Sequence, residues 1–372
     1  MANIIPFRPV LPDLNDIISF DDFFGTAKRK FPLYYRDGYY QMDQEPSLLI
    51  YRIIRHNRSH TGIIACTHVE DYIQGHIKRH EFTLADKEAR MQELFEERNG
   101  VIKPILLTYP NVLEIDALIN RITISMPPSF KIPFEDDQHV FWLLKEEEHV
   151  QRLQELFKDK IPSSYICDGH HRMTTAERLY AQHKSKEAKN PYHYIMAAYF
   201  PASEILIHNY NRILKSLKGL SEEEFLQKLE KYYEVSLEPM AFRPLRRGEM
   251  GCYIKGRWRK LILKEEYSPG DETSVADSLD VHLFNRYILQ DILGIEDVRN
   301  DVEVRYVGGV KGPAALERKV DEESAVAAFN LYPVAMEDLI SISDLRGTLP
   351  PKSTYVEPRM RNGFTAQMYS KI

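Results

Sequence analysis

The segment around Asp168-Gly169 constrains the fold of this chain more than any other part of the sequence. The residues Ser164–Cys167 read as a short buried strand that runs directly into the Asp-Gly turn. After the turn, apolar residues recur at intervals of three and four, as on one face of a helix: Met173, Ala176, Leu179 and Tyr180. A strand, a tight turn and a helix in succession predict an α/β protein.

Length and composition place this turn in an ordinary globular protein. The chain has 372 residues, of which 43% are hydrophobic and 28% are charged. These values are typical of folded domains and argue against global disorder or a fibrous structure. A chain of this length is too long for one small core, so we expect two domains or one domain with large insertions.

Charge and cysteine content exclude several classes of protein. The formal net charge is -6, whereas proteins that bind nucleic acid usually carry a basic surplus, so no nucleic-acid partner is expected. The three cysteines are scattered and odd in number, which fits a reducing compartment. No signal peptide is visible, and no apolar run approaches the roughly 18 to 20 residues of a spanning helix. We therefore expect a cytoplasmic protein with no membrane partner.

Two local patterns suggest further elements. Tyr34-Tyr35, Asp37-Gly38 and Tyr39-Tyr40 read as a β-hairpin within a β-rich stretch. Thr83 followed by Asp86 has the spacing of a capping box at the start of a helix. The polar segment 216–222 contains a glycine and predicts a boundary between a domain at 1–215 and a mixed α/β domain at 216–372.

The Asp-Gly turn has the features of an anion-binding site. Backbone N–H groups converge on an anion at a helix N-terminus, and Gly169 permits a close approach. Arg172 in the first turn can offer two donors to a phosphate or a carboxylate. Asp168 would repel a bare phosphate, so it would need a metal ion or a ligand donor. The alternative is that Asp168 only caps the helix and that His170 and His171 are solvated.

Metal binding by the two histidines is disfavoured. Adjacent residues of a helix point about 100° apart, so His170 and His171 would not hold one ion together. The sequence also contains no His-Glu-x-x-His and no paired Cys-x-x-Cys motif.

Two charged segments are weaker candidates. In Lys78-Arg79-His80-Glu81, Glu81 could act as a general base if a cleft raised its pKa, and the alternative is a charged loop. In the tail, Lys352, Ser353 and Thr354 could close over an anion, and the alternative is a loop delimited by prolines.

Together these pieces resemble a known protein core. The stretches His76–Glu81, Gly100–Leu107 and Ile166–Arg172 follow the order found in free serine kinases, which share a fold with ParB-type nucleotide-binding domains and sulfiredoxins. Over nearly its full length the chain more closely resembles a large bacterial family, domain-of-unknown-function family ten-fifteen, described as serine-kinase-like. The matching segments are 58–63, 78–81, 168–172, 209–212 and 351–355.

The resemblance implies a fold and an activity. It implies a ParB/sulfiredoxin-like α/β core with an insertion at about 110–163, followed by a C-terminal domain whose tail returns to the site. By motif, Glu81 becomes the base with His80 beside it. The phosphate site is assigned to five residues: Asp168, Gly169, His170, His171 and Arg172. Lys78 and residues 352–354 would be accessory.

We therefore expect a phosphotransferase that moves a phosphoryl group from ATP or ADP to the hydroxyl of a small metabolite, with free serine as the first acceptor to test. Mg²⁺, with Asp168 as a ligand, is the implied cofactor, and a homo-oligomer is compatible with the sequence. One alternative is a nucleotide- or anion-binding module without catalysis. A second is a redox enzyme of the sulfiredoxin type, which would need Cys167 to be reactive.

Overall fold

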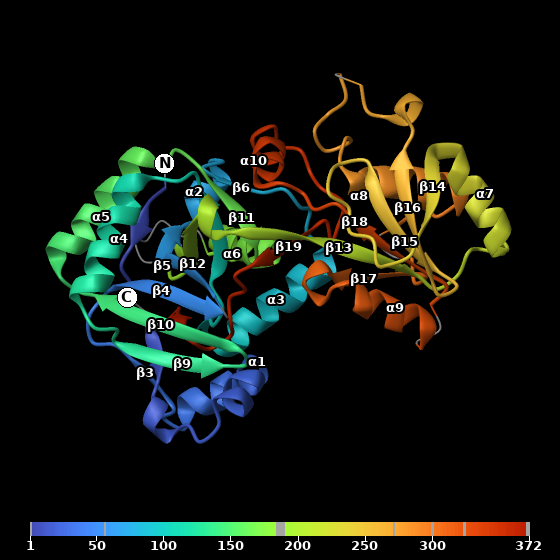
Figure 1. Cartoon of the computed structure of the whole chain (residues 1–372). Helices are drawn as coiled ribbons and strands as arrows, with labels where there is room; N and C mark the ends of the chain where they lie inside the picture. Colours follow the sequence, from blue (N-terminus) through green and yellow to red (C-terminus); the bar gives the residue numbers. More distant parts are fainter. Residues whose placement is uncertain are drawn as a thin grey trace. The chain divides into compact units, whose positions relative to one another are not determined.

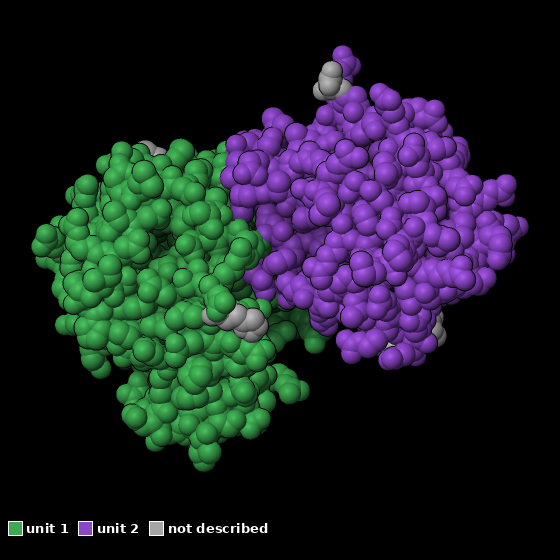
Figure 2. All heavy atoms as spheres, in the orientation of Figure 1, with its two compact units in different colours: residues 1–206, 358–372 green, residues 207–357 purple. Residues whose placement is uncertain are grey.

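The chain folds into two compact units. The computed structural model describes residues 2–55, 57–183, 190–270, 272–298, 301–322 and 325–369. Unit 1 comprises Met1–Leu206 and Pro358–Ile372, and unit 2 comprises Ile207–Glu357 (Figure 2). The segment 216–222, where the sequence suggested a boundary, lies inside unit 2. The C-terminal residues after Glu357 are part of unit 1, so the chain enters unit 2 and then returns.

Unit 1 is built on a nine-stranded mixed sheet (Figure 1). The strand order is β6-β11-β8-β12-β5-β4-β10-β9, and β1 pairs with β5. Its strands are β1 (Ile4–Ile5), β4 (Leu48–Arg55), β5 (Arg58–His68), β6 (Ile77–Lys78), β8 (Ile105–Tyr109), β9 (Phe130–Phe134), β10 (Asp137–Leu144), β11 (Ser164–Asp168) and β12 (Tyr194–Pro201). Two small pairs accompany it: β2 (Val10–Pro12) with β3 (Tyr40–Met42), and β7 (Gly100–Val101) with β20 (Gln367–Met368).

Helices cover this sheet. They are α1 (Phe20–Arg36), α2 (Val69–Ile73), α3 (Ala85–Arg98), α4 (Leu113–Ser125), α5 (Glu147–Lys160) and α6 (His170–Gln182). Helix α4 packs on α5, and α6 packs on both α2 and α3 (Figure 1). The mixed α/β class expected from the sequence is confirmed. The segment 110–163 supplies β9, β10, α4 and α5, and β10 pairs with β4 along its full length, so this segment is part of the main sheet.

Helix α1 shows that the hairpin predicted around Asp37-Gly38 is wrong. Tyr34 and Tyr35 lie in the last turns of α1, and Asp37 is the C-cap residue. The helix buries a set of apolar side chains with helical spacing: Phe23, Phe24, Ala27 and Phe31. The strand propensity of the tyrosines is thus outweighed by the packing of this face, and the Asp-Gly pair ends a helix instead of joining two strands.

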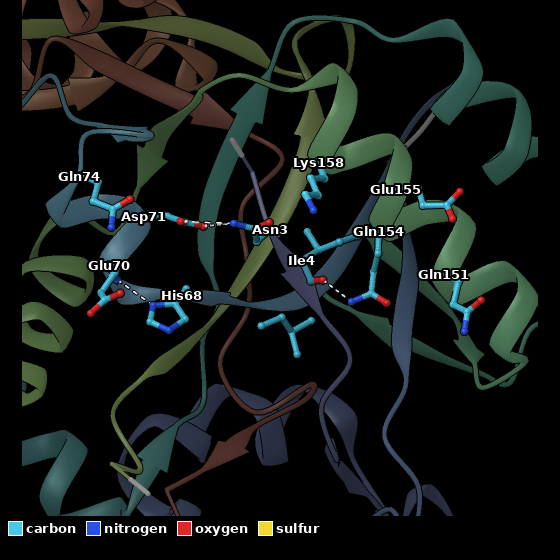
Figure 3. A pocket seen from close by; sticks show the side chains of 11 residues that line it. Asn3, Ile4, His68, Glu70, Asp71, Gln74, Gln151, Gln154, Glu155 and Lys158 are labelled. Carbon is cyan, nitrogen blue, oxygen red and sulfur yellow. Dashed lines mark hydrogen bonds between the residues drawn. The ribbon is translucent and has the colours of Figure 1, made fainter. Parts of the chain in front are cut away.

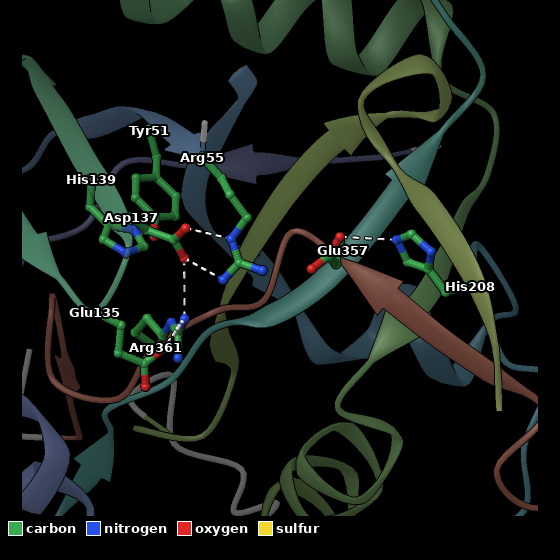
Figure 4. Close-up of polar contacts among 8 residues, drawn as sticks. All are labelled: Tyr51, Arg55, Glu135, Asp137, His139, His208, Glu357 and Arg361. Atoms are coloured by element: carbon green, nitrogen blue, oxygen red, sulfur yellow. Dashed lines mark hydrogen bonds and ion pairs between the residues drawn. The ribbon is translucent and has the colours of Figure 1, made fainter. Parts of the chain in front are cut away.

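The C-terminal segment is held against unit 1 by aromatic and ionic contacts. The ring of Phe364 packs edge-on against Phe24, with ring centroids 4.6 Å apart. Arg361 donates a hydrogen bond to the buried carboxylate of Asp137 at 3.2 Å (Figure 4). Arg55 binds the same carboxylate through two nitrogens, at 2.5 and 2.8 Å. Two arginines from distant parts of the chain therefore share one carboxylate.

Unit 2 has its own seven-stranded sheet and core. The strand order is β14-β16-β15-β18-β13-β17, and β19 pairs with β13. The strands are β13 (Leu206–Leu214), β14 (Tyr233–Glu238), β15 (Glu249–Ile254), β16 (Arg257–Leu263), β17 (Val304–Gly308), β18 (Ala327–Leu331) and β19 (Thr354–Glu357). The helices are α7 (Glu222–Tyr232), α8 (Asp280–Leu283), a π-helical continuation of α8 (Phe284–Ile292), α9 (Pro313–Asp321) and α10 (Met336–Asp344).

None of the helices formed by the described residues is long and apolar enough to span a bilayer.

Candidate functional site

The N-terminus of α6 is built as the sequence predicted. Strand β11 ends at Asp168, and Gly169 adopts a left-handed conformation with φ of 106° before α6 begins at His170. The N-cap residue, Gly169, has no side chain with which to cap this helix end. The guanidinium of Arg172 folds back onto the turn, and a β-carbon at Gly169 would lie 2.6 Å from its Nη2 atom. The backbone angle therefore favours glycine here, and a side chain at this position would displace the guanidinium of Arg172.

Two cations converge on Asp168 at this turn. Lys103 Nζ and Arg172 Nη2 each lie 3.1 Å from Asp168 Oδ2. Lys103 comes shortly before β8, and β8 runs antiparallel to β11 with Leu106 opposite Asp168. The pairing of these two strands thus brings a lysine from far along the chain to the start of α6. We call Lys103, Asp168 and Arg172 the ionic cluster.

The electrostatics of the ionic cluster favour charged side chains. Burial alone would raise the pKa of Asp168, but the cations of Arg172 and Lys103 outweigh it, and the pKa of this carboxyl lies well below its usual value. Burial lowers the pKa of Lys103, and Asp168 partly offsets that effect. The charge of Arg359, from the C-terminal segment of unit 1, lowers the pKa of Lys103 further. The cluster holds more positive than negative charge.

Glu81 lies beside the first residue of α6. Its Oε2 atom is 3.9 Å from His170 Nδ1, and its side chain is 34% exposed. Strand β6 places it there, because β6 pairs in parallel with β11 and Lys78 lies opposite Tyr165. The structure therefore brings the Glu81 segment and the Asp168–Arg172 turn together within unit 1.

His80 is a buried neutral imidazole. It is 1% exposed, and its ring meets that of His170 edge-on, with centroids 4.6 Å apart. Burial lowers the pKa of His80 to about 4, and burial also lowers the pKa of His170. Neither ring nitrogen of His80 has a hydrogen-bond partner among the described residues. Within this arrangement His80 can position His170 through ring packing, but it does not face solvent.

His171 and the start of α3 are also linked. The backbone N–H of Leu84 donates to His171 Nε2 at 3.3 Å. Leu84 is the N-cap of α3 and has no side-chain capping bond, so the capping box predicted for Thr83 and Asp86 does not form. Thr83 instead donates its hydroxyl hydrogen to the carboxylate of Glu88. Helix α3 begins at Ala85, two residues after Thr83.

The accessory residues belong to another unit or make contacts of their own. Lys78 Nζ lies 5.8 Å from the centroid of the Tyr165 ring. Residues 352–354 belong to unit 2. There the hydroxyl of Ser353 is buried and donates to Pro350 O at 2.6 Å, while Lys352 Nζ lies 5.5 Å from the centroid of the Tyr210 ring. Thr354 is the first residue of β19.

The described residues do not form a metal site from protein side chains alone. Among the described residues, no group of three His, Cys, Asp or Glu side chains could hold a metal ion. Mg²⁺ is commonly bound by one or two carboxylates together with substrate phosphates. Asp168 fits that second mode, in which most ligands of the ion come from a nucleotide.

Unit 1 also contains a separate polar cavity of about 650 Å³ (Figure 3). The buried carboxylate of Asp71 is on its wall and accepts a hydrogen bond from Asn3 Nδ2 at 3.5 Å. Burial raises the pKa of Asp71. None of the residues of the ionic cluster lines this cavity, so it is distinct from the candidate site.

Lys103 and Arg359 were not recognised from the sequence. Lys103 stands before Pro104 and a run of apolar residues, which looks like the polar start of a buried strand. Only the pairing of β8 with β11 shows that it faces Asp168. One sequence feature could have pointed to Lys103 as a site residue. It is a cation immediately before a buried strand, in a chain that also contains an Asp-Gly turn.

Comparison with known proteins gives the family of the chain. It is a mixed α/β protein with two cations gathered at a helix N-terminus. The family model described as "Protein of unknown function (DUF1015)" matches residues 11–282, and the chain belongs to this family. The membership expected from the sequence motifs is thereby confirmed. A comparison with curated proteins finds no match.

Among solved structures, the chain is similar at low identity to several proteins. A free serine kinase in complex with AMP is 13% identical, with a TM-score of 0.40 over 79% of this chain and 86% of that chain. C-terminally truncated SbnI from Staphylococcus aureus is 10% identical, with a TM-score of 0.43 over 80% and 85%. A conserved hypothetical protein from Pyrococcus furiosus is 12% identical, with a TM-score of 0.37 over 83% and 94%.

Proposed function

We propose that this protein is a phosphotransferase that moves a phosphoryl group from ATP or ADP to the hydroxyl of a small metabolite, with free serine as the first acceptor to test. The observation that carries the proposal is the position of Glu81. Its carboxylate lies 3.9 Å from His170 at the helix end where Lys103 and Arg172 gather around Asp168.

The helix end supplies what a nucleotide phosphate needs. Phosphoryl transfer depends mainly on positioning and on neutralising charge. The N-cap of α6, Gly169, has no side chain that competes with a ligand for the helix end, and the helix dipole adds positive potential there. Arg172 also has a buried Nε atom without a hydrogen-bond partner among the residues that the structure describes. A phosphate oxygen is a suitable acceptor for this donor. Mg²⁺ brought with the nucleotide would be held by Asp168 and would neutralise further phosphate charge.

In this proposal Glu81 acts as the base. Its carboxylate accepts the proton of the acceptor hydroxyl as the hydroxyl oxygen attacks the terminal phosphorus of the nucleotide. The new O–P bond forms while the bond from that phosphorus to the bridging oxygen breaks. The nucleotide leaves with one phosphoryl group fewer. A carboxylate that is one third exposed can meet a small solute while it lies beside His170.

The redox alternative is disfavoured by Cys167. A reactive thiol needs a lowered pKa and some exposure. Cys167 is buried in β11, and burial raises the pKa of its thiol well above the usual value. A module that binds nucleotide without catalysis remains the competing function, and it gives no role to Glu81.

The test is a mass-spectrometric screen. Wild type and Glu81→Gln are incubated with ATP or ADP and Mg²⁺ against a panel of amino acids and other hydroxylated metabolites. We expect a phosphorylated product with wild type and far less with Glu81→Gln. If no acceptor in a broad panel is phosphorylated while nucleotide binds tightly, the binding module is the correct function.

A further inference from the structure

Lys103 is the member of the ionic cluster to which neither the sequence motifs nor the transfer reaction assigns a role. Its Nζ atom and the Nη2 atom of Arg172 each lie 3.1 Å from the same oxygen, Asp168 Oδ2. We propose that Lys103 is a phosphate-binding residue of the nucleotide site, which exchanges Asp168 for a nucleotide phosphate when a metal ion occupies that carboxylate. This inference rests on the proposed nucleotide site and adds to it a residue and a dependence on metal.

The backbone holds Lys103 beside the turn that precedes α6. Pro104 follows it, β8 begins at Ile105, and the antiparallel pairing of β8 with β11 places Leu106 opposite Asp168. The Lys103 side chain is 24% exposed, so most of it is buried. An ammonium has three donors, and among the described residues only the carboxylate of Asp168 accepts one of them. Lys103 therefore has donors left for a ligand at the turn.

The ionic cluster holds more positive charge than its one carboxylate neutralises. Lys103 and Arg172 carry two positive charges, and Asp168 carries one negative charge. Their ammonium and guanidinium groups meet at one carboxylate oxygen, where like charges repel each other more strongly than in water. The buried Nε atom of Arg172 has no hydrogen-bond partner in the part of the chain that the structure describes. The surplus of charge and of donors favours a second anion at this place.

Asp168 is the most exposed member of the ionic cluster. Its side chain is 47% exposed, compared with 24% for Lys103 and 11% for Arg172. A carboxylate oxygen is the kind of ligand that Mg²⁺ takes from a protein when substrate phosphates supply further ligands. Lys103 and Arg172 would be repelled by a metal ion on their shared oxygen, so each needs another acceptor. Phosphate oxygens of the nucleotide provide it, and nucleotide and metal should therefore strengthen each other's binding.

The competing explanation gives Lys103 a structural role. In that case Lys103 and Arg172 only fix the carboxylate of Asp168, and Lys103 does not contact the nucleotide. The two explanations differ when the charge of Asp168 is removed. A structural Lys103 then loses its purpose, whereas a phosphate-binding Lys103 becomes available to the nucleotide without any metal.

The experiment is calorimetric titration with ADP, without an acceptor, in Mg²⁺ or in EDTA. Wild type should bind ADP at least about tenfold more tightly in Mg²⁺. Asp168→Asn keeps the shape of the side chain but removes its charge, so in EDTA it should bind ADP at least about tenfold more tightly than wild type does. Lys103→Gln should weaken binding at least about tenfold, both in Mg²⁺ and, combined with Asp168→Asn, in EDTA. Lys30→Gln, which removes an exposed lysine of α1, is the control.

The outcomes separate this inference from the proposed function. Wild-type affinity in Lys103→Gln, or no gain of metal-free affinity in Asp168→Asn, overturns the inference. Asp168→Ser removes the same charge and takes the place of Asp168→Asn if urea unfolding shows that variant to be unfolded. A loss of affinity in Arg172→Ala beside wild-type affinity in Lys103→Gln keeps the nucleotide site and overturns only the role of Lys103.

The converse result is equally distinct. The expected changes in ADP affinity, found in a protein that phosphorylates no acceptor, support the inference and leave a nucleotide-binding module as the function. A wild-type protein that binds no ADP in either buffer overturns both the inference and the proposed site.

Discussion

The carboxylate of Glu81 lies 3.9 Å from the imidazole of His170, the first residue of α6. This relationship connects a residue in the loop after the short edge strand β6 to the turn after β11. It depends on the parallel pairing of those two strands. A candidate base and a candidate phosphate site thus come together through the topology of the sheet, although 87 residues separate Glu81 from Asp168 in the chain.

Replacing Gly169 should damage both the fold and the site. Gly169→Ala places a side chain at φ of 106° and pushes against the guanidinium of Arg172, so we expect a loss of about 1 to 3 kcal/mol in the free energy of unfolding. Nucleotide binding should weaken as Arg172 moves. Gly75→Ala is a matched control, because Gly75 also has a positive φ but nothing within 4 Å of the added carbon. Urea unfolding measures the loss of stability, and calorimetric titration measures the loss of nucleotide affinity. Equal nucleotide affinity in Gly169→Ala and Gly75→Ala would contradict the close packing of Arg172 on the turn.

Removing Arg172 should weaken nucleotide binding. Arg172→Ala deletes a cation and several donors at the helix end, and we expect an increase of at least about tenfold in the Kd for ADP or ATP. Arg172→Lys keeps the charge but not the planar fork, and should recover only part of the affinity. Calorimetric titration measures the Kd for the nucleotide. Arg90→Ala, which removes an exposed arginine of α3, is the control. Wild-type affinity in Arg172→Ala would exclude this helix end as the phosphate site.

The buried neutral His80 predicts a specific dependence of stability on pH. Burial lowers the pKa of His80 to about 4, below its value of about 6.5 in an unfolded chain. The unfolded chain therefore takes up the proton first, and stability is lost as the pH falls from about 6.5 towards 4. Because of this residue, the free energy of unfolding of wild type should fall by about 2 kcal/mol when the pH is lowered from 7 to 5.

The comparison with His80→Leu isolates that contribution. Urea unfolding at pH 7 and pH 5 gives the loss for each protein, and the loss should be smaller in the variant. His139→Leu serves as a second case, since burial also lowers the pKa of that histidine to about 3. Equal losses in wild type and His80→Leu would show that His80 is not a neutral buried group.

Arg361 should anchor the C-terminal segment of unit 1. It shares the buried Asp137 carboxylate with Arg55 and also lies 2.7 Å from Glu135 (Figure 4). Arg361→Ala should lower the free energy of unfolding by about 2 kcal/mol, because one of two cations on a buried carboxylate is lost. It should also speed proteolytic release of the last residues. Lys131→Ala, an exposed cation on β9, is the control, and identical proteolysis of the two variants would exclude an anchoring role.

The parts of the structure that could be predicted from sequence were those set by local patterns. The strand, turn and helix from Ser164 to Gln182 follow from apolar spacing and the Asp-Gly pair. The hairpin predicted around Asp37 was wrong. That prediction considered only the strand propensity of the nearby tyrosines, whereas the apolar face that stabilises α1 is formed by residues earlier in the chain.

The candidate site was predicted only in part for the same reason. The Asp168 turn and Glu81 stood out as motifs, whereas Lys103 becomes part of the ionic cluster only through the antiparallel pairing of β8 with β11. The burial of His80 is likewise a tertiary property, since its sequence neighbours Arg79 and Glu81 are charged. Contacts between strands distant in sequence cannot be derived from local spacing.

The most direct test of the central claim measures turnover and nucleotide affinity on the same preparation of Glu81→Gln, with the best acceptor found in the screen. A base contributes to the chemical step, so kcat should fall by about 10²- to 10⁴-fold while the Kd for nucleotide stays near that of wild type. Glu93→Gln, an exposed carboxylate on α3, should leave both values unchanged. A Glu81→Gln variant that turns over as fast as wild type would contradict the account.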